Sequence, residues 1–277
     1  MKILFAASEA YPIIKTGGLG DVVYSLPRAL KHEKADVRVI LPAYRVVLEQ
    51  MPQIRVAGWL EIPGIEKTHS VRILETTEQH LGVPLLLVDV ASLFDRPGNP
   101  YVHPDGYNWH DNAERFAVFS RAVARLAISD KILGWQPDIV HCHDWQTGLI
   151  PACLSQYPGA PKSVFTIHNL SYSGMFSHED FARLNLRKEW WSSHAMEFFG
   201  NFSMLKAGLI FADQVTTVSP NYAVEICTPG QGYGFDGILR SNSHKLSGIL
   251  NGIDEEVWNP QTDSFLPHRY SVDRNYV

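Results

Sequence analysis

The sequence has no long apolar run, and this absence sets the first limit on its function. Nowhere do about 18 apolar residues follow one another, the length that a membrane-spanning helix needs. The apolar stretch at the N-terminus stops at Glu9 and has no small-residue cleavage site, so it predicts a first strand rather than a signal peptide. We therefore expect no membrane partner.

Cysteine and strong charge are also scarce. Cys142, Cys153 and Cys227 are odd in number and form no C-x-x-C pair, which favours a reducing cytoplasm over a disulfide framework. The formal net charge is −5 with no basic run, which argues against nucleic acid as the main partner. With 45% apolar and 19% charged residues, the chain of 277 residues has the composition of a soluble globular protein.

Apolar runs and helical patterns alternate along the chain. This alternation predicts an α/β fold, a Rossmann-like parallel sheet with helices on both faces. Residues 78–82 separate two of the runs and predict a hairpin. The predicted strands lie at residues 1–8, 36–41, 55–64, 69–77, 83–90, 138–142, 163–167, 214–219 and 246–252.

Two of the predicted helices have specific features. In the first, at residues 21–30, Pro27 should bend the helix or remove one hydrogen bond. In the second, Asp111 and Glu114 have the spacing of a capping box. The apolar positions at helical intervals are Val22, Leu26, Ala29 and Leu30 in the first helix, and Phe116, Phe119, Val123 and Leu126 in the second.

The stretch "KTGGLGD" lies between the first strand and the first helix. Glycines at this place expose backbone N–H groups at a helix N-terminus, where an anion is favoured. A glycine cluster alone is also compatible with a simple tight turn. Lys15 beside Gly17 and Gly18 favours a phosphate site.

Polar residues follow the strands at the points where the strands end. In an open parallel sheet, ligands bind beyond these carboxyl ends. His141, His143 and His168 lack a compact set of further ligands, so we expect no metal. His168 can be a ligand contact or a core residue, and Trp145 can pack or stack on a sugar. The residues concerned are Ser8-Glu9, His143-Asp144-Trp145, His168-Asn169, Ser219-Pro220-Asn221 and Asn251-Gly252.

Two enzyme classes fit glycines in an α/β sheet: a dinucleotide oxidoreductase and a nucleotide-sugar transferase. A dinucleotide site needs G-x-G-x-x-G and a carboxylate at the end of the second strand. Here the glycines read G-G-L-G and the second strand ends "LPAY", so the oxidoreductase interpretation is weak.

Six stretches resemble the signatures of bacterial glycogen synthases and plant starch synthases, in the family's order and over nearly the whole chain. One small departure is Gly20, where many bacterial relatives carry alanine. The stretches are "KTGGLGDVVYSLPRAL", "LFDRPGNPY", "HCHDWQTGLIP", "SVFTIHNLSYSGMF", "SMLKAGLIFADQVTTVSP" and "LSGILNGIDEEVWNP".

The resemblance implies the N-terminal half of a two-domain GT-B glycosyltransferase, which transfers glucose from ADP-glucose to an α-1,4-glucan with retention and without a cofactor. It implies that Lys15, Gly17 and Gly18 meet the donor phosphates and that His168 lies beside the donor glucose. The residues implied to line the cleft for sugar or acceptor are Asp21, Asp144, Trp145, Asn169 and Asn251.

The resemblance also implies a domain division. We expect residues 1–250 to form the Rossmann-like starch synthase catalytic domain, and residues 251–277 to begin the connection to a missing C-terminal domain, without which the chain is expected to be inactive. The alternative is a stand-alone domain that binds glucan or a partner protein without catalysis.

Overall fold

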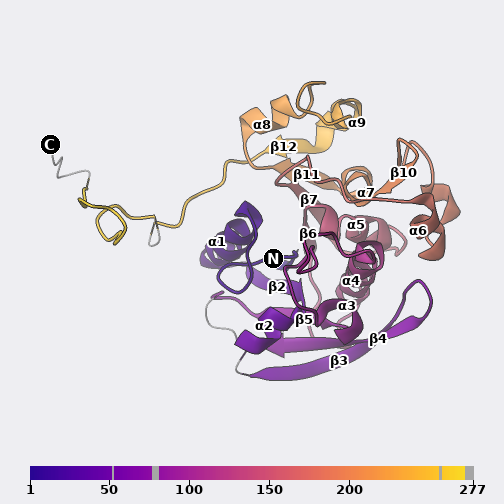
Figure 1. Cartoon of the computed structure of the whole chain (residues 1–277), viewed down its shortest axis with the longest axis horizontal. Helices are drawn as coiled ribbons and strands as arrows, with labels where there is room; N and C mark the ends of the chain where they lie inside the picture. The colour runs from indigo at the N-terminus through magenta and orange to yellow at the C-terminus, as the bar shows by residue number, and fades with distance from the viewer. Residues whose placement is uncertain (52, 77–80, 256–257, 272–277) are drawn as a thin grey trace.

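A computed structural model describes residues 1–51, 53–76, 81–255 and 258–271. Within these residues the strands form a nine-stranded sheet in the order β12-β11-β7-β6-β1-β2-β5-β4-β3, and a small sheet in the order β8-β10-β9. Figure 1 shows the strands of the large sheet stacked through the molecule, with α1 on one side and α4 and α5 on the other. The predicted parallel sheet with helices on both faces is confirmed.

The strands of the large sheet pair in parallel from β12 to β5, and β4 and β3 add an antiparallel edge. The predicted hairpin is confirmed by the antiparallel pairing of β4 with β5, although residues 78–80 of its connection lie outside the described residues. The strands are β1 (Lys2–Ala6), β2 (Asp36–Pro42), β3 (Ile54–Pro63), β4 (Thr68–Thr76), β5 (Leu85–Asp89), β6 (Ile139–His143), β7 (Lys162–Ile167), β8 (Met175–Phe176), β9 (Glu197–Phe198), β10 (Asn201–Ser203), β11 (Gln214–Thr217) and β12 (Leu246–Gly248).

None of the helices in the described ranges is long and apolar enough to span a bilayer. The α-helices are α1 (Gly18–His32), α2 (Arg45–Gln50), α3 (Ala91–Phe94), α4 (Asn112–Ala127), α5 (Leu149–Leu154), α6 (His178–Arg183), α7 (Met204–Phe211), α8 (Pro220–Glu225) and α9 (Asp236–Ser241). Short 3₁₀ turns are η1 (Trp145–Thr147), η2 (Lys188–Trp190) and η3 (Ser243–Lys245).

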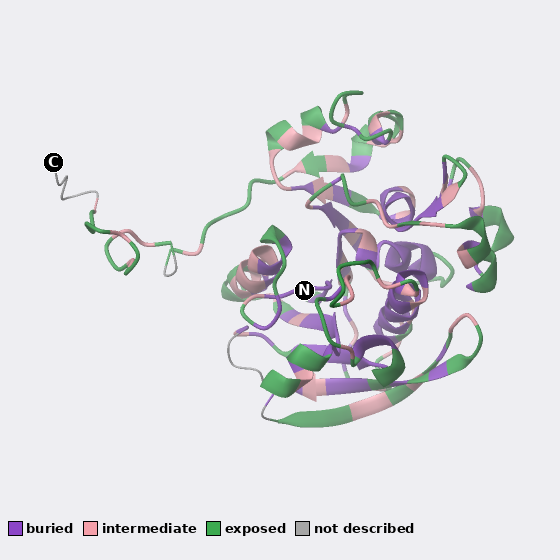
Figure 2. Cartoon of the chain, in the orientation of Figure 1, coloured by how far each residue is buried: buried purple, intermediate pink, exposed green. Residues whose placement is uncertain are grey.

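The core lies on both faces of the central strands, which are the buried purple elements of Figure 2. All residues of β5 are buried, and Leu4, Phe5 and Ala6 of β1 have no exposed surface. Strands buried on both faces require near-continuous apolar sequence, which explains why these runs do not alternate. After Gly248 the chain leaves the sheet as an extended tail (Figure 1).

One detail of the predicted helices, the capping box, is wrong. The Asp111–Glu114 capping box does not form, because Arg96 takes the carboxylate of Asp111 while Glu114 accepts from Ile65 N at 2.8 Å. In α1 the buried positions are Leu19, Gly20, Val23 and Pro27, whereas Val22 is only half-buried and Ala29 is exposed. The helix continues through Pro27 without interruption.

The predicted apolar stripe of α4 is confirmed, and it is accompanied by a buried arginine. Arg115 is 1% exposed and donates to the carbonyls of Leu93 at 2.7 Å and Pro100 at 2.9 Å and to Asn112 Oδ1 at 2.7 Å. These bonds fasten the loop between α3 and α4 to the helix, which fixes the backbone around Tyr101.

We predict that Arg115→Met lowers the free energy of unfolding by about 2–4 kcal/mol, because it leaves buried carbonyls without donors. Urea denaturation measures the change. Arg125→Met, at an exposed position of the same helix, is the matched control and should change stability by less than about 0.5 kcal/mol. Equal effects of the two substitutions would contradict this role of Arg115.

Candidate functional site

Strands β7, β6 and β1 are neighbours in the sheet and all run in the same direction. Their carboxyl ends therefore lie side by side, as expected from the sequence. The residues that follow these ends are His168-Asn169, Asp144-Trp145 and Ser8-Glu9. This part of the sheet edge is the candidate site.

The glycine loop, residues 15–18, is held to the sheet edge by Glu9. This carboxylate is 3% exposed and accepts hydrogen bonds from Thr16 N, from Thr16 Oγ1 at 2.7 Å and from Gly17 N at 3.2 Å. Tyr101 donates to the same carboxylate and shares a hydrogen bond with Ser8. The N–H group of Gly17, expected to face a phosphate, is therefore occupied by Glu9.

Gly17 and Gly18 are not required by the fold itself. Neither has a positive φ, and a Cβ placed on either would meet no atom within 4 Å. An incoming group that approaches the backbone closely would give both positions a reason to lack a side chain. Gly18 is the first residue of the 15-residue helix α1, whose N-terminus favours an anion.

Lys15 forms an ion pair with Asp21 at 2.7 Å, and the two side chains are 39% and 48% exposed. A pair this exposed contributes little to stability, about 0–1 kcal/mol. Lys15 can therefore exchange Asp21 for a phosphate at low cost.

Asp144 is held in a strained conformation, with φ 56° and ψ −176°. This region is essentially restricted to glycine and costs about 1–3 kcal/mol for other residues. The Asp144 carboxylate accepts from His168 N at 2.8 Å, which joins the ends of β6 and β7. Burial raises the pKa of Asp144 to about 7 despite backbone N–H donation from His168 and Asn169, and the nearby Glu9 raises it further.

His141 and His143 of β6 and His168, which follows β7, form a row of three histidines next to Asp144. The rings of His141 and His143 stack with their centroids 4.2 Å apart, which confirms that both lie on one face of β6. His143 Nδ1 and His168 Nε2 are 3.0 Å apart, so one of them donates a hydrogen bond to the other. His141 Nε2 lies 2.6 Å from Thr166 Oγ1.

The row is kept uncharged by its surroundings. Burial lowers the pKa of His168 to about 4 and that of His141 to about 3, with the nearby His168 lowering the latter further. Burial lowers the pKa of His143 well below its usual value as well. No group of three or more His, Cys, Asp or Glu side chains in the described ranges is arranged to hold a metal ion.

The remaining predicted site residues differ in their placement. Trp145 packs in an aromatic cluster, with its ring centroid 4.9 Å from that of Phe116 and 6.3 Å from that of Tyr101. Asn169 is exposed, and its side chain accepts from Ser171. Asn251 follows β12, and its backbone N–H donates to Val218 O. This hydrogen bond does not connect Asn251 to any of the other predicted site residues.

Sequence analysis assigned no role to Glu9, Tyr101 or His143. The sequence signal that could have identified Glu9 as a site residue was its position directly after the first strand. Tyr101 lies in a loop rich in aromatic residues, and only the folded chain brings it to Glu9 across 92 positions. His143 was expected at this edge of the sheet and was considered as a metal ligand, but it was given no role in binding the donor.

We predict that Glu9→Gln loosens the glycine loop without unfolding the protein. The neutral amide is a weaker acceptor for the N–H groups of Thr16 and Gly17. Amide hydrogen exchange at these two positions should accelerate at least about fivefold, corresponding to the loss of about 1 kcal/mol. The exposed Glu49→Gln is the control, and unchanged exchange in Glu9→Gln would contradict the anchoring role.

We predict that stability falls as the pH is lowered from 7 to 5.5. The pKa of each of the three histidines of the row is lower in the folded protein than in the unfolded chain, so the unfolded chain binds protons first as the pH falls. For His168, the stability that is present above pH 6.5 is therefore lost as the pH falls toward about 4. The three histidines together should lose about 3 kcal/mol by pH 5.5, and protonation of Asp144, whose pKa is raised to about 7, should offset part of this loss. His168→Gln should reduce this loss, whereas His194→Gln, at an exposed position, should not. Melting temperatures across this pH range measure it.

Comparison with known proteins identifies the family of the chain. The family model for the starch synthase catalytic domain matches residues 2–241. The chain is 50% identical to a glycogen synthase of Hydrogenovibrio crunogenus, covering 100% of this chain and 57% of that protein. It is 49% identical to a glycogen synthase of Thioalkalivibrio sulfidiphilus, covering 99% of this chain and 56% of the relative. The chain thus spans about half the length of these relatives.

A solved structure gives the same result for the fold. It is the catalytic domain of starch synthase IV from Arabidopsis thaliana bound to ADP and acarbose, with a TM-score of 0.83 and 32% identity. The match covers 98% of this chain and 55% of that chain. The expected GT-B type of α/β fold is confirmed. The chain belongs to the starch synthase catalytic domain family.

Proposed function

We propose that this chain forms the N-terminal half of the active site of a retaining glucosyltransferase. In this proposal the whole enzyme transfers glucose from ADP-glucose to the non-reducing end of an α-1,4-glucan. The observation that carries the proposal is that two features lie at the same sheet edge. One is the glycine loop, which Glu9 anchors and whose glycines the fold does not otherwise require. The other is the hydrogen bond between His168 N and the carboxylate of Asp144. The Arabidopsis relative, bound to ADP and acarbose, supports a nucleotide and a glucan-like ligand.

The diphosphate would bind at the N-terminus of α1. Lys15 would leave Asp21 and pair with a phosphate, and the free N–H groups of the first turn of α1 would donate to it. Positive charge and N–H donors that strengthen as the diphosphate leaves stabilise the transition state electrostatically. This chemistry fits the predicted absence of a metal.

His168 would contact the donor glucose as a neutral ring. A pKa near 4 keeps the imidazole uncharged at neutral pH, so it acts through hydrogen bonding and shape rather than as a cation. Its bond with His143 fixes the orientation of the ring. Glu9 is saturated by donors from the loop and Tyr101, so it does not supply a nucleophile of the kind used by glycosidases.

We also propose the division expected from the sequence, with residues 1–250 as the folded domain and residues 251–277 as the start of the connection to a C-terminal domain. The last strand ends at Gly248 and the family match ends at residue 241. Cytoplasmic location is part of the proposal, supported by the free Cys142, Cys153 and Cys227.

The proposal predicts glucose transfer only when the second half is present. The chain fused to the C-terminal half of the Hydrogenovibrio crunogenus glycogen synthase should label glycogen from radiolabelled ADP-glucose, and the chain alone should not. A folded fusion that transfers no glucose would favour a stand-alone binding domain. Robust labelling by the chain alone would contradict the proposed division.

In this fusion, Lys15→Ala should lower kcat/KM for ADP-glucose by about 10- to 100-fold, because it removes charge-assisted bonds of about 1.5–3 kcal/mol. Lys188→Ala, at an exposed position, is the matched control. Steady-state kinetics measure both variants. Kinetics unchanged by Lys15→Ala would contradict phosphate binding at the glycine loop and would indicate that the loop is a simple turn.

His168→Ala separates catalysis from packing in the same fusion. If His168 binds glucose more tightly in the transition state, kcat should fall by about 100-fold or more, at least about 2.7 kcal/mol, with a nearly unchanged melting temperature. A large fall in melting temperature with normal kcat in the folded fraction would assign His168 to the core.

A further inference from the structure

His143 is buried beside the candidate site, and aromatic rings hold its imidazole. The side chain has no exposed surface. It stacks on Phe5 of β1, with the ring centroids 5.3 Å apart and the ring planes at 20°, and on His141, with the centroids 4.2 Å apart. Burying a polar ring is unfavourable unless hydrogen bonds compensate for the lost water. The hydrogen bonds of His143 therefore indicate what this position gains from a histidine.

The two ring nitrogens of His143 have different surroundings. Nδ1 lies 3.0 Å from Nε2 of His168, within hydrogen-bond distance. Nε2 is buried and has no hydrogen-bond partner among the described residues. A neutral imidazole carries one proton, on one of its two nitrogens. The free energy of the folded site therefore depends on which nitrogen of His143 carries it.

Two neutral arrangements produce a hydrogen bond between the two rings. In the first, Nδ1–H of His143 donates to Nε2 of His168, and Nε2 of His143 keeps an unused lone pair. In the second, Nε2–H of His168 donates to Nδ1 of His143, and His143 is left with a buried Nε2–H that has no acceptor. The proton of His168 lies on Nδ1 in the first arrangement and on Nε2 in the second.

The surroundings of His143 favour the first arrangement. Buried N–H groups without an acceptor are rare in folded proteins, whereas buried acceptors with an unused lone pair are less rare. Burial also lowers the pKa of both His143 and His168, so neither ring gains a second proton at neutral pH. The first arrangement leaves only a lone pair unpaired, and it places the proton of His168 on Nδ1.

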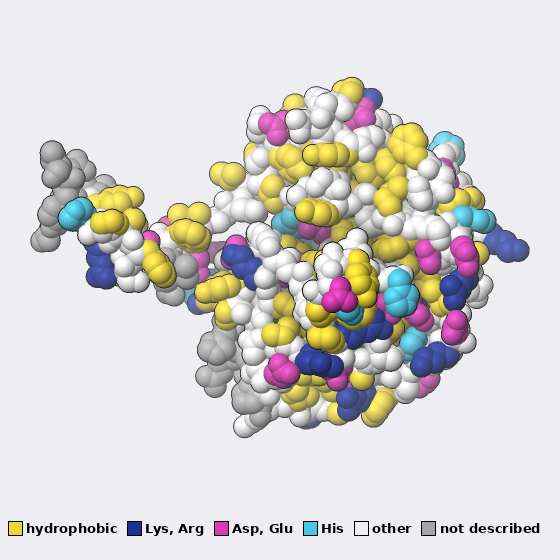
Figure 3. Space-filling view, viewed as in Figure 1, with side chains coloured by type: hydrophobic (Ala, Val, Ile, Leu, Met, Phe, Trp, Pro, Cys, Tyr) yellow, Lys and Arg dark blue, Asp and Glu magenta, His cyan; other side chains and the backbone are white. Residues whose placement is uncertain are grey.

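The other nitrogen of His168 is accessible. The residue is partly exposed, although its Nε2 is bonded to the buried His143. Its Nδ1 makes no hydrogen bond within the described ranges and, unlike Nε2 of His143, is not sealed from solvent. Figure 3 shows histidine surface, in cyan, in the region between α1 and β7. The nitrogen whose protonation depends on His143 is thus the one that can meet a ligand.

No other side chain in the described part of the chain competes for this task. The carboxylate of Asp144 accepts from the backbone N–H of His168 and not from its ring. Glu9 accepts from the glycine loop and from Tyr101. The bond from His143 is the one hydrogen bond to the His168 imidazole within these residues.

We propose that His143 is a positioning residue that holds His168 in the tautomer with its proton on Nδ1. His168 then presents an N–H donor to the donor glucose, and a sugar hydroxyl oxygen accepts from it. The inference rests on the proposed function, in which His168 contacts this glucose. His143 itself touches no substrate and takes part in no bond-making step.

The direct test is the nitrogen chemical shifts of the His168 ring in this chain, recorded at neutral pH by long-range proton–nitrogen correlation. The signals are assigned by their loss in His168→Gln. Nδ1 should resonate in the range of a protonated nitrogen, and Nε2 in that of an unprotonated nitrogen. The reverse pattern, or an average of the two, would overturn the proposal.

Substitution of His143 separates the hydrogen bond from packing. His143→Leu fills the space without a donor, so the His168 signals should move toward an average of both tautomers. His143→Asn retains an N–H donor near the position of Nδ1 and should restore the pattern of the unsubstituted chain. A His168 spectrum that is unchanged in His143→Leu, or not restored in His143→Asn, would contradict the role of His143.

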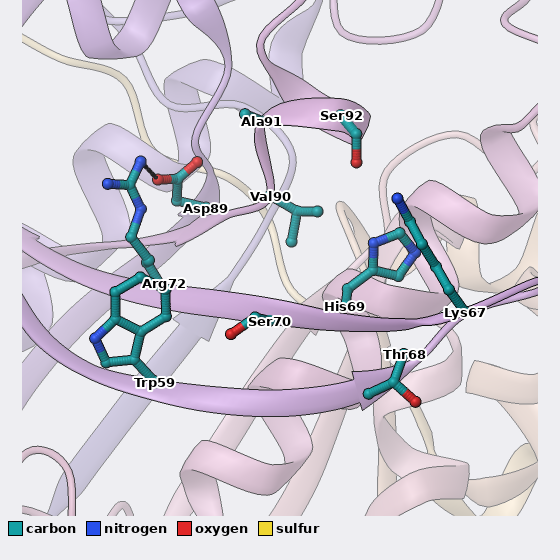
Figure 4. Close-up of a pocket in the computed structure, with 10 residues that line it drawn as sticks. All are labelled: Trp59, Lys67, Thr68, His69, Ser70, Arg72, Asp89, Val90, Ala91 and Ser92. Atoms are coloured by element: carbon teal, nitrogen blue, oxygen red, sulfur yellow. Dashed lines mark ion pairs between the residues drawn. The ribbon is translucent and has the colours of Figure 1, made fainter.

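His69→Leu is the matched control for the loss of a buried histidine. His69 lies on β4 (Figure 4), and its Nε2 is 3.0 Å from Glu114 Oε1. Strand β4 is four strand spacings from β6, about 19 Å along the sheet. The substitution should lower the melting temperature without moving the His168 signals. Equal shifts in His69→Leu and His143→Leu would show that loss of packing alone moves them, and would contradict the proposal.

Kinetics of the fusion described above connect the tautomer with the donor. Among analogues of ADP-glucose that each lack one glucose hydroxyl, one should react with at least about tenfold lower kcat/KM, because its loss leaves Nδ1–H of His168 unpaired. His143→Leu should remove most of this discrimination, and His143→Asn should restore it. Discrimination that is equal in all three proteins would contradict the role of His143 toward the donor.

Failure of this inference can be distinguished from failure of the proposed function. Absence of transfer by the unsubstituted fusion would contradict the proposed function. The tautomer of His168 is decided separately, by the spectrum of the chain alone.

Discussion

The buried carboxylate of Glu9 is the interaction on which the candidate site depends. It binds the backbone of the glycine loop through Thr16 and Gly17 and accepts from Tyr101, which belongs to the loop between α3 and α4. Hydrogen bonds to a charged acceptor are about twice as strong as neutral ones. The Glu9 side chain thus fixes two loops relative to β1. Arg115 of α4 also fixes the second loop, through its hydrogen bond to Pro100 O.

The site combines this rigid frame with groups that are costly to bury. Asp144 has a strained backbone, and His141, His143 and His168 stay neutral because their surroundings exclude charge. Strain and desolvation of this kind persist only where neighbouring structure imposes them, and they concentrate at functional sites. The Lys15–Asp21 pair is different, since both side chains are accessible and can rearrange when a ligand binds.

The sequence predicted the sheet because buried parallel strands leave continuous apolar runs, and it predicted the common edge because the ends of parallel strands must meet. It could not predict that Glu9 occupies the N–H group of Gly17, since this depends on the path of a loop. It also could not predict the role of Arg115 or the partners of Asp111 and Glu114, because Arg96, Ile65 and Leu93 lie outside α4, where the local pattern of the helix gives no information. Local patterns determine elements, whereas tertiary packing decides which polar groups pair.

The most direct measurement is a crystal structure, with ADP bound, of this chain fused to the second half of a glycogen synthase. We predict that the diphosphate lies within hydrogen-bond distance of Gly18 N and Lys15 Nζ, with Lys15 released from Asp21 and His168 facing the space beyond the terminal phosphate. Glu9 should keep its bonds to the glycine loop. A diphosphate bound away from the N-terminus of α1, with the Lys15–Asp21 pair intact, would contradict the assignment of this sheet edge as the donor site.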